Sequence, residues 1–130
     1  MDRKEFFKHL ILGLAGISLV NHLHAKTKSK VIILSHPLVA GFHYYDGYKT
    51  EQYLNVDDEL RLFRQPDNPY DKNAIEVYHG NAKLGYIPRR QNKIIVRMMD
   101  QGIEIKSRIV NVYLSRPSYE RVRIEVYMES

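Results

Sequence analysis

The sequence predicts a mainly β fold in which short strands curl into one small barrel around a single core. Polar and apolar residues alternate with a period of two in four segments, at residues 59–62, 75–78, 103–109 and 121–128. Such strands have one apolar and one charged face, as in an antiparallel sheet with one buried side. Between the second segment and the apolar Leu84 lies the turn Gly80–Asn81, which predicts a β-hairpin.

One helix is predicted to interrupt the strands, between the hairpin and residue 103. Pro88 stands near its start, where proline is favoured. Apolar pairs at 94–95 and 98–99 are one helical turn apart, and Gly102 follows as a stop signal. Short strands with one or two helices are typical of a modified OB-like or SH3-like small β-barrel that is partly open.

Residues 1–25 differ from the rest of the chain and are predicted to precede the barrel as a signal-like apolar helix. Positive residues come first, then the apolar run Leu10–Val20, then the small residue Ala25. This is the order of a secretory signal peptide, and the run is shorter than the roughly 20 residues that span a bilayer. An N-terminal helix belonging to the fold is the alternative, which the glycines in the run disfavour.

The predicted organisation has three parts: a signal peptide or N-terminal membrane anchor at 1–25, a basic lead-in with the first strand at 26–37, and a domain at 38–130. If the signal is real, the protein is exported to the periplasm or tethered to the inner membrane. The membrane or the export machinery is then a partner of residues 1–25. Otherwise the protein is cytoplasmic.

The composition fits one globular domain. Of 130 residues, 44% are hydrophobic and 27% are charged, which is typical of a folded rather than a disordered chain. There is no cysteine, so a disulfide framework and a cysteine zinc site are impossible. The six histidines are not closely paired, as metal sites prefer, and we expect no metal and no cofactor. The net charge of +5 permits an anionic partner but is weak support for nucleic acid.

Tyrosines and one polar run supply the candidate binding residues. Several tyrosines lie near Gly, Asp or Asn rather than inside apolar runs, namely Tyr44, Tyr45, Tyr48, Tyr70 and Tyr86. Tyrosine has a flat stacking face and a polar hydroxyl, which suits bases or sugars. The run Asn68–Ile75 combines a turn, an aromatic ring, a carboxylate and two amides at the entry of a strand. Loops held on a rigid scaffold are where binding residues tend to lie.

The candidate binding residues can also have a purely structural role, and this alternative stays open. Asn-Pro and Asp-x-Asn are ordinary turn sequences, because proline fixes φ and Asn and Asp side chains bond their own backbone. Tyr44 and Tyr45 can pack in a strand around Gly41 and Gly47. The pair Arg89–Arg90 can be a solvated helix start, since cations there oppose the helix dipole.

Three segments resemble the signature segments of the HIRAN domain family. They are Val39–Gly47, Leu62–Val77 and Leu84–Arg89, and the resemblance extends from about Leu38 to Val110. It implies a modified OB-like barrel with one or two helices. In eukaryotic fork-remodelling translocases this domain holds the 3′-hydroxyl end of single-stranded DNA; elsewhere it stands alone or beside helicase and nuclease modules.

The resemblance also implies roles for single residues. Tyr44 and Tyr70 match the aromatic residues that sandwich the terminal bases. Asp71 matches the carboxylate that accepts a hydrogen bond from the terminal 3′-hydroxyl. Asn68 and Tyr45 match residues that support this pocket.

The basic positions follow the family pattern in part. Tyr86 and Arg89 lie where a polar ring and a phosphate-binding cation are expected, and Lys93 in the same helix can hold the departing backbone. His43 stands where the DNA-binding members have an arginine, and Tyr86 where they have a histidine. One phosphate contact is thereby weakened, since histidine is mostly neutral near pH 7.

Three kinds of function are compared. The first is a nucleic-acid-binding module that grips single-stranded DNA 3′ ends by tyrosine stacking, a carboxylate on the 3′-hydroxyl and basic residues on phosphates. The second is an exported, non-catalytic module of the same fold for a glycan, peptide or envelope partner. An enzyme is disfavoured: His43 with Asp46, or His79, is a weak acid–base candidate, residues 57–59 are a weak metal site, and no nucleophile-plus-base spacing or Walker-type loop is present.

Overall fold

The structure is a computed structural model that describes residues 30–130, and residues Val31–Ser130 form one compact unit. The predicted signal at 1–25 therefore lies outside the described residues. Among residues 30–130, no helix is long and apolar enough to cross a membrane.

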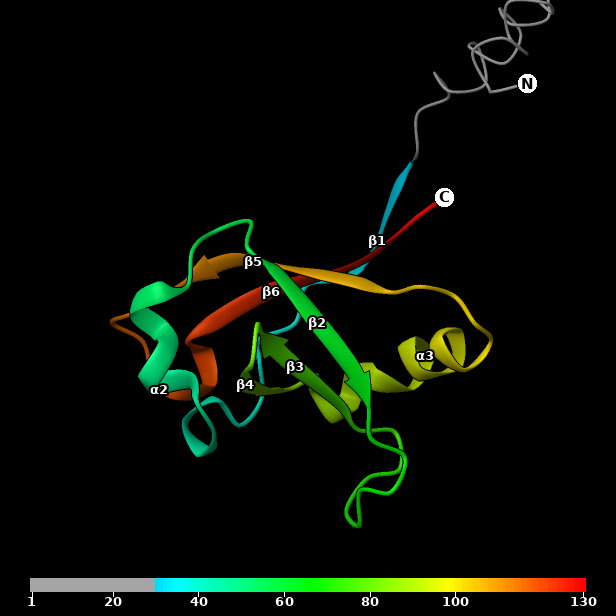
Figure 1. Cartoon of the computed structure of the whole chain (residues 1–130), viewed down its shortest axis with the longest axis horizontal. Helices are drawn as coiled ribbons and strands as arrows, with labels where there is room; N and C mark the ends of the chain where they lie inside the picture. Colours follow the sequence, from blue (N-terminus) through cyan, green and yellow to red (C-terminus); the bar gives the residue numbers. More distant parts are fainter. Residues whose placement is uncertain (1–29) are drawn as a thin grey trace, which may run out of the picture. The chain divides into compact units, whose positions relative to one another are not determined.

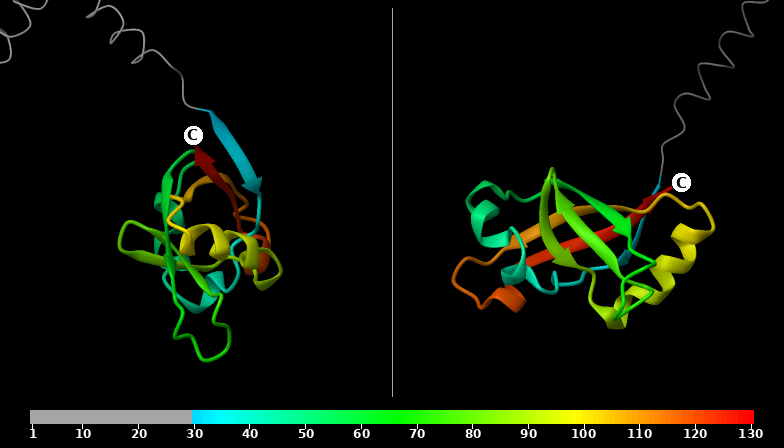
Figure 2. Two further views of the ribbon diagram at one scale, coloured as in Figure 1. Left: turned by 90° about the vertical axis from the view of Figure 1, so that its right-hand side faces the viewer. Right: turned by 60° about the horizontal axis from the view of Figure 1, so that its bottom comes forward.

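Six strands form one antiparallel sheet with the order β1-β6-β5-β2-β3-β4. Their bounds are β1 (Val31–Ser35), β2 (Glu59–Arg64), β3 (Ile75–His79), β4 (Ala82–Tyr86), β5 (Lys106–Val112) and β6 (Val122–Glu129). The sheet is strongly bent, so that β2 and β3 run across the direction of β5 and β6 (Figures 1 and 2). The prediction of a mainly β fold with few helices is confirmed, and so is the β3–β4 hairpin around Gly80.

The two ends of the sheet are joined by the segment before the first helical turn. Leu38 bridges Arg123 of β6, and Ala40 bridges Tyr86 of β4. The Ala40 N–H donates to the Tyr86 carbonyl at 2.8 Å, and the Tyr86 N–H donates to the Ala40 carbonyl at 2.9 Å. Gly85 permits this approach, because its φ is +149° and a Cβ there would lie 2.1 Å from the Ala40 oxygen.

The principal helix is α3 (Arg89–Asp100), preceded by Pro88 as predicted. Its end is a Schellman motif, in which the Ile103 N–H donates to Met98 and the Gly102 N–H to Met99. Gly102 accordingly has a φ of +88°. Ile94 is one of the apolar residues whose spacing predicts the helix, but it is 62% exposed. Ile95 and Val96 are the buried residues of this stretch of α3.

Shorter helical segments lie before β2 and before β6. They are η1 (Phe42–Tyr44), α2 (Gly47–Thr50), η2 (Glu51–Tyr53) and η3 (Ser118–Glu120). Tyr44 and Tyr45 are 74% and 39% exposed, at the end of η1 and just after it. The alternative that they pack inside a strand is therefore wrong.

The core lies inside the bent sheet and follows the predicted alternation. Buried side chains come from every strand except β1, and include Leu60, Ile75, Val77, Leu84, Ile109, Ile124 and Val126. One predicted strand lies further along the chain than expected, because β5 begins at Lys106 and ends at Val112 rather than spanning residues 103–109. The reason is local: the Ile103 N–H is already used to cap α3.

Candidate nucleic-acid interface

The loop between β2 and β3 is a turn built by side-chain hydrogen bonds. Asn68 Oδ1 accepts from the backbone N–H groups of Tyr70 at 2.8 Å and Asp71 at 3.1 Å. Asp71 Oδ1 accepts from the Asn73 N–H at 2.9 Å. The turn chemistry expected of Asn-Pro and Asp-x-Asn is therefore present. It fixes the Asp71 carboxylate and leaves the Tyr70 ring 85% exposed.

Helix α3 holds the same loop from the side, where Figure 1 shows the loop beside the helix. Asn92, which is 2% exposed, donates from Nδ2 to Asp71 Oδ2 at 2.8 Å. Arg89 donates to the Tyr70 carbonyl, and its Nε lies 3.6 Å from Asp71 Oδ2. Arg89 is thus bonded to the loop and is not simply a solvated helix start.

The electrostatic balance at Asp71 favours the ionised carboxylate. Burial alone would raise the pKa of Asp71, but the hydrogen bonds from Asn73 and Asn92 and the charge of Arg89 together lower it. The side chain of Asp71 remains 20% exposed. A hydrogen-bond donor that reaches this carboxylate from solvent therefore meets a negative charge at neutral pH.

A second anchor ties the loop to the far end of α3. Arg64 at the end of β2 donates from Nε and Nη2 to the two Asp100 carboxylate oxygens, at 2.9 and 3.1 Å. Its Nη1 donates to the Lys72 carbonyl at 3.0 Å. Bidentate pairs of this kind fix geometry as well as charge. The loop is consequently held at both of its sides.

Two tyrosines form the wall opposite the loop, with a lysine behind them. The rings of Tyr45 and Tyr86 are 5.7 Å apart with an interplanar angle of 66°. Lys83 Nζ lies 4.2 and 4.4 Å from the two ring centroids and donates to the Tyr86 hydroxyl at 2.9 Å. That hydroxyl donates to Gln65 Oε1 at 2.7 Å. Burial opposes the charge of Lys83, but the bonds to Tyr86 and Glu76 raise its pKa, so the ammonium stays charged.

Loop and wall enclose a cleft of about 340 Å³, here called the tyrosine cleft. Its lining residues are Ala40, Tyr45, Asn68, Tyr70, Asp71, Ala74, Tyr86, Ile87 and Arg89. Six of the nine residues predicted for the site are among them. The volume lies at the lower end of the range of about 300–1,000 Å³ that is usual for ligand pockets.

Three predicted residues lie outside this lining. The His43 ring is 3.8 Å from the Tyr44 ring, and His43 Nδ1 is 2.9 Å from Ser118 Oγ. The rings of Tyr44 and Tyr45 both lie near Gly41, because a Cβ there would be 3.8 Å from the Tyr44 ring and 3.3 Å from the Tyr45 ring. Lys93 is exposed on α3. The roles of these three in binding stay predictions.

Three supporting residues were not found from the sequence. Asn92 carries a usable signal, because it lies one turn before the buried Ile95 and Val96 and is thus a polar residue on the apolar face of the helix. Lys83 and Gln65 carry no such signal. They meet Tyr86 only through the pairing of strands and the course of the loop.

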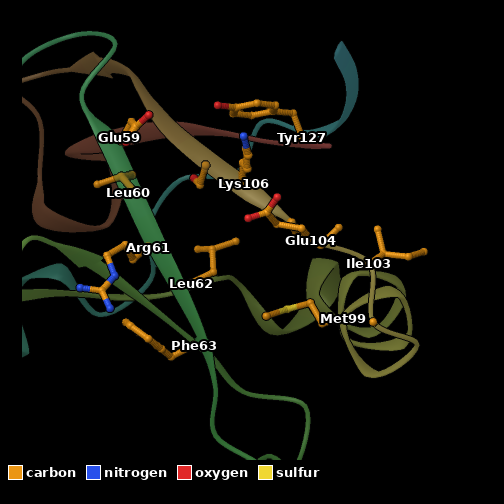
Figure 3. Close-up of a pocket in the computed structure, with 13 residues that line it drawn as sticks. Glu59, Leu60, Arg61, Leu62, Phe63, Met99, Ile103, Glu104, Lys106 and Tyr127 are labelled. Atoms are coloured by element: carbon orange, nitrogen blue, oxygen red, sulfur yellow. The ribbon is translucent and has the colours of Figure 1, made fainter. Parts of the chain in front are cut away.

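A larger hollow, here called the β2–β5 groove, lies between β2, the end of α3 and the start of β5 (Figure 3). Its volume is about 620 Å³. Charged side chains of both signs line it: Glu59, Arg61, Glu104 and Lys106. None of the nine predicted site residues is part of this groove.

Two residues that were weak candidates for catalysis or metal binding, His79 and Asp58, contact each other. His79 Nε2 lies 2.9 Å from Asp58 Oδ2, which also accepts from the Asn55 N–H at 2.9 Å. Within residues 30–130 no three His, Cys, Asp or Glu side chains gather in a way that could hold a metal ion.

The fold and the site define a small β domain with an aromatic and carboxylate cleft where the ends of one sheet meet. A model of the HIRAN domain matches residues 37–130. The chain therefore belongs to the HIRAN domain family, as the resemblance of its three segments predicts.

The chain is also similar to much longer proteins. It is 38% identical over 66 residues to the helicase-like transcription factor of Mus musculus and 33% identical over 66 residues to that of Homo sapiens. Each match covers 50% of this chain but 6% of the relative. The similarity thus concerns one small part of those proteins.

Two crystal structures have a similar fold. A protein from Lactobacillus plantarum matches with a TM-score of 0.69 and 28% identity, over 79% of this chain and 99% of that one. The HIRAN domain of human HLTF matches with a TM-score of 0.54 and 23% identity, over 76% of this chain and 77% of that one. The second likeness concerns the fold alone.

Proposed function

We propose that this domain binds the free 3′ end of single-stranded DNA in the tyrosine cleft, without catalysing a reaction. The observation that carries the proposal is the Asp71 carboxylate, fixed by Asn73 and Asn92 and still partly exposed beside an exposed ring. A terminal 3′-hydroxyl is a hydrogen-bond donor, and a charged acceptor roughly doubles the strength of such a bond.

Asp71 has room for this bond. An ionised carboxylate offers about four lone-pair positions. Asn73 and Asn92 each use one, on different oxygens. A ligand hydroxyl can therefore be accepted without loss of either supporting bond. A terminal phosphate, in contrast, brings negative charge against a carboxylate and is repelled.

The rings and cations suit the rest of a nucleotide. Tyr70 is free to stack on a base, and stacking of this kind contributes about 1–3 kcal/mol per base without regard to sequence. Tyr44 is the predicted second ring of the sandwich. Arg89 is the proposed phosphate contact, which is supported by its side chain being 71% exposed at the edge of the cleft.

The proposal includes a more specific description of the bent sheet, namely that it is an OB-like barrel. It is supported by the link from β4 through Ala40 to β6, which joins the sheet ends. In barrels of that type, one face of the curved sheet and the adjoining loops bind single strands. The tyrosine cleft lies at such a junction of sheet and loop.

The test compares two octathymidylates that differ only in a free or a phosphorylated 3′ end. We expect the wild-type domain to prefer the free end and Asp71→Asn to lose most of that preference. Asp67→Asn is the matched control, because Asp67 is an exposed carboxylate of the same loop. Equal affinity of the wild type for both ends, measured by fluorescence anisotropy, would remove the proposed role of Asp71.

A further inference from the structure

The outward side of β2, β3 and β4 carries aromatic and basic side chains next to the tyrosine cleft. Cross-strand partners project to the same face of a sheet. The register pairs Arg61 with Tyr78 and Tyr78 with Lys83. Figure 3 shows Arg61 and Phe63 on one side of β2 and Leu62 on the other. We call Arg61, Phe63, Tyr78 and Lys83 the outer face.

The outer face contains a second aromatic platform. The rings of Phe63 and Tyr78 are 5.4 Å apart with an interplanar angle of 85°. The Arg61 guanidinium lies 4.8 Å from the centroid of the Phe63 ring. Phe63 is 38% exposed although it is an apolar ring in a strand. A hollow of about 500 Å³ borders these residues. An exposed ring with a cation beside it is the combination that single-stranded binding surfaces use.

This platform is continuous with the cleft. Phe63 pairs with Glu76 on β3, and Glu76 pairs with Tyr86 on β4, which lines the cleft. The one acidic residue of that row is neutralised, because Lys83 Nζ lies 3.1 Å from Glu76 Oε2. A polyanion can therefore cross from Tyr86 to Phe63 without meeting an unpaired carboxylate of this row.

We propose that a single strand whose 3′ end lies in the tyrosine cleft continues across the outer face, with a base stacked on Phe63 and a phosphate at Arg61. Two inter-strand spacings separate β4 from β2, about 10 Å in all. Stacked nucleotides advance by about 3.4 Å, so roughly three nucleotides cover this distance. The inference rests on the proposed function, and it gives the domain a binding site of about five nucleotides rather than an end pocket alone.

The surface on the β5 side of β2 does not offer the same route. Glu59 lies on the same face of β2 as Arg61 and Phe63, but at the end of the strand that pairs with β5. There Glu59 and Glu104 line the β2–β5 groove, and two carboxylates repel a phosphate backbone. Arg64, the remaining cation of β2, is engaged by Asp100 and the Lys72 carbonyl. Arg61 is therefore the cation of β2 that we assign to a phosphate of the DNA strand.

The test is a length series of thymidylates with free 3′ ends, from two to eight nucleotides, titrated into the full chain. Wild-type affinity should rise up to about five nucleotides and then level off. Phe63→Leu keeps an apolar side chain but removes the ring, so it should leave dinucleotide binding unchanged and weaken octanucleotide binding by about 5- to 150-fold. Tyr53→Leu is the matched control, since Tyr53 is an aromatic residue 64% exposed in η2.

A second variant tests the phosphate contact. Arg61→Gln should reduce the slope of log affinity against log salt for the octanucleotide by about 0.7, the value for one phosphate on a single strand. The slope for the dinucleotide should not change. This readout separates a lost phosphate contact from a general loss of stability.

Each outcome has a distinct meaning. Loss of the length increment in Phe63→Leu, with dinucleotide binding intact, supports the extended site. An unchanged length series in Phe63→Leu and Arg61→Gln overturns it while the end pocket stands. Failure of the wild type to bind any length overturns both the end pocket and its extension.

Discussion

The tyrosine cleft and the β2–β5 groove are the two hollows that invite comparison, and the larger one is the weaker candidate. The groove has about 620 Å³ and the cleft about 340 Å³. The cleft, however, has a carboxylate fixed by two donors, an exposed ring, and a charged lysine behind its wall. Fixed polar groups in a partly apolar hollow, rather than volume, therefore make the cleft the stronger candidate for a binding site.

The two hollows also differ in origin. The cleft is built by side chains that bond across loop, helix and strand, and such preorganisation lowers the cost of binding. The groove arises because the β2–β5 ladder extends only over Glu59–Leu60, next to the capped end of α3. Ser107 Oγ is buried beside it and has no hydrogen-bond partner among residues 30–130. The groove is thus explained by the way the helix ends.

The largest effect should come from the glycine that lets the sheet ends meet beside the cleft. Gly85→Ala places a Cβ 2.1 Å from the Ala40 oxygen at a positive φ, so we expect a loss of about 4 kcal/mol in the free energy of unfolding. Gly80→Ala is the control, because nothing lies within 4 Å of its Cβ, and should cost about 1–2 kcal/mol. Equal losses in urea denaturation would show that the closure is not needed.

The next effect concerns the buried amide behind Asp71. Asn92→Leu removes a donor to a partly buried carboxylate, and we expect a loss of about 2 kcal/mol together with a higher pKa of Asp71. Arg97→Ala, an exposed change in the same helix, should stay within about 0.5 kcal/mol of the wild type. Denaturation and an NMR titration of Asp71 measure the two quantities; an unchanged pKa would contradict the assigned role.

Binding should distinguish the cleft from the groove directly. Tyr70→Ala should weaken binding of an octathymidylate by about 5- to 150-fold with little change in stability, because the ring is 85% exposed. Glu104→Gln in the groove should leave affinity within about twofold, or raise it slightly through the lost negative charge. A stronger effect of the groove variant than of Tyr70→Ala, measured by anisotropy, would reverse the comparison.

The smallest effect is the pH dependence of stability. The pKa of Asp71 is lower in the folded protein than its ordinary value of 3.8. Its ionisation therefore stabilises the fold fully above that value and ceases to do so as the pH falls through the folded-state pKa. The difference in unfolding free energy between wild type and Asp71→Asn should be constant from pH 5 to 8 and change only below about pH 4. A change centred near neutral pH would contradict this.

The parts of the fold and of the candidate site that could be predicted depend on residues that are close together in the sequence. Asn68, Tyr70 and Asp71 lie in one run, so their proximity needs no tertiary knowledge, and the alternation of residues 59–62 and 75–78 places β2 and β3. Tyr86 was a candidate because it is a tyrosine next to a glycine, and Arg89 became one through the family resemblance. Both lie in the cleft lining.

Other features could not be predicted, because they depend on contacts between residues that are far apart in the sequence. Lys83 and Gln65 meet at the Tyr86 hydroxyl through strand register, and the β5 start depends on how α3 is capped. Ile94 illustrates a further limit. An apolar stripe about 100° wide has room for only some of a run of apolar residues, and the sequence alone does not tell that Ile95 and Val96, rather than Ile94, are buried.

The central claim, that the smaller cleft binds the strand end, is tested most directly by backbone amide NMR shifts during titration with a hexathymidylate bearing a free 3′-hydroxyl. We expect the largest shifts at residues 68–73 and at Tyr86 and Arg89, and smaller ones at Arg61 and Phe63. Shifts concentrated at residues 102–107, with the loop between β2 and β3 unaffected, would contradict the account.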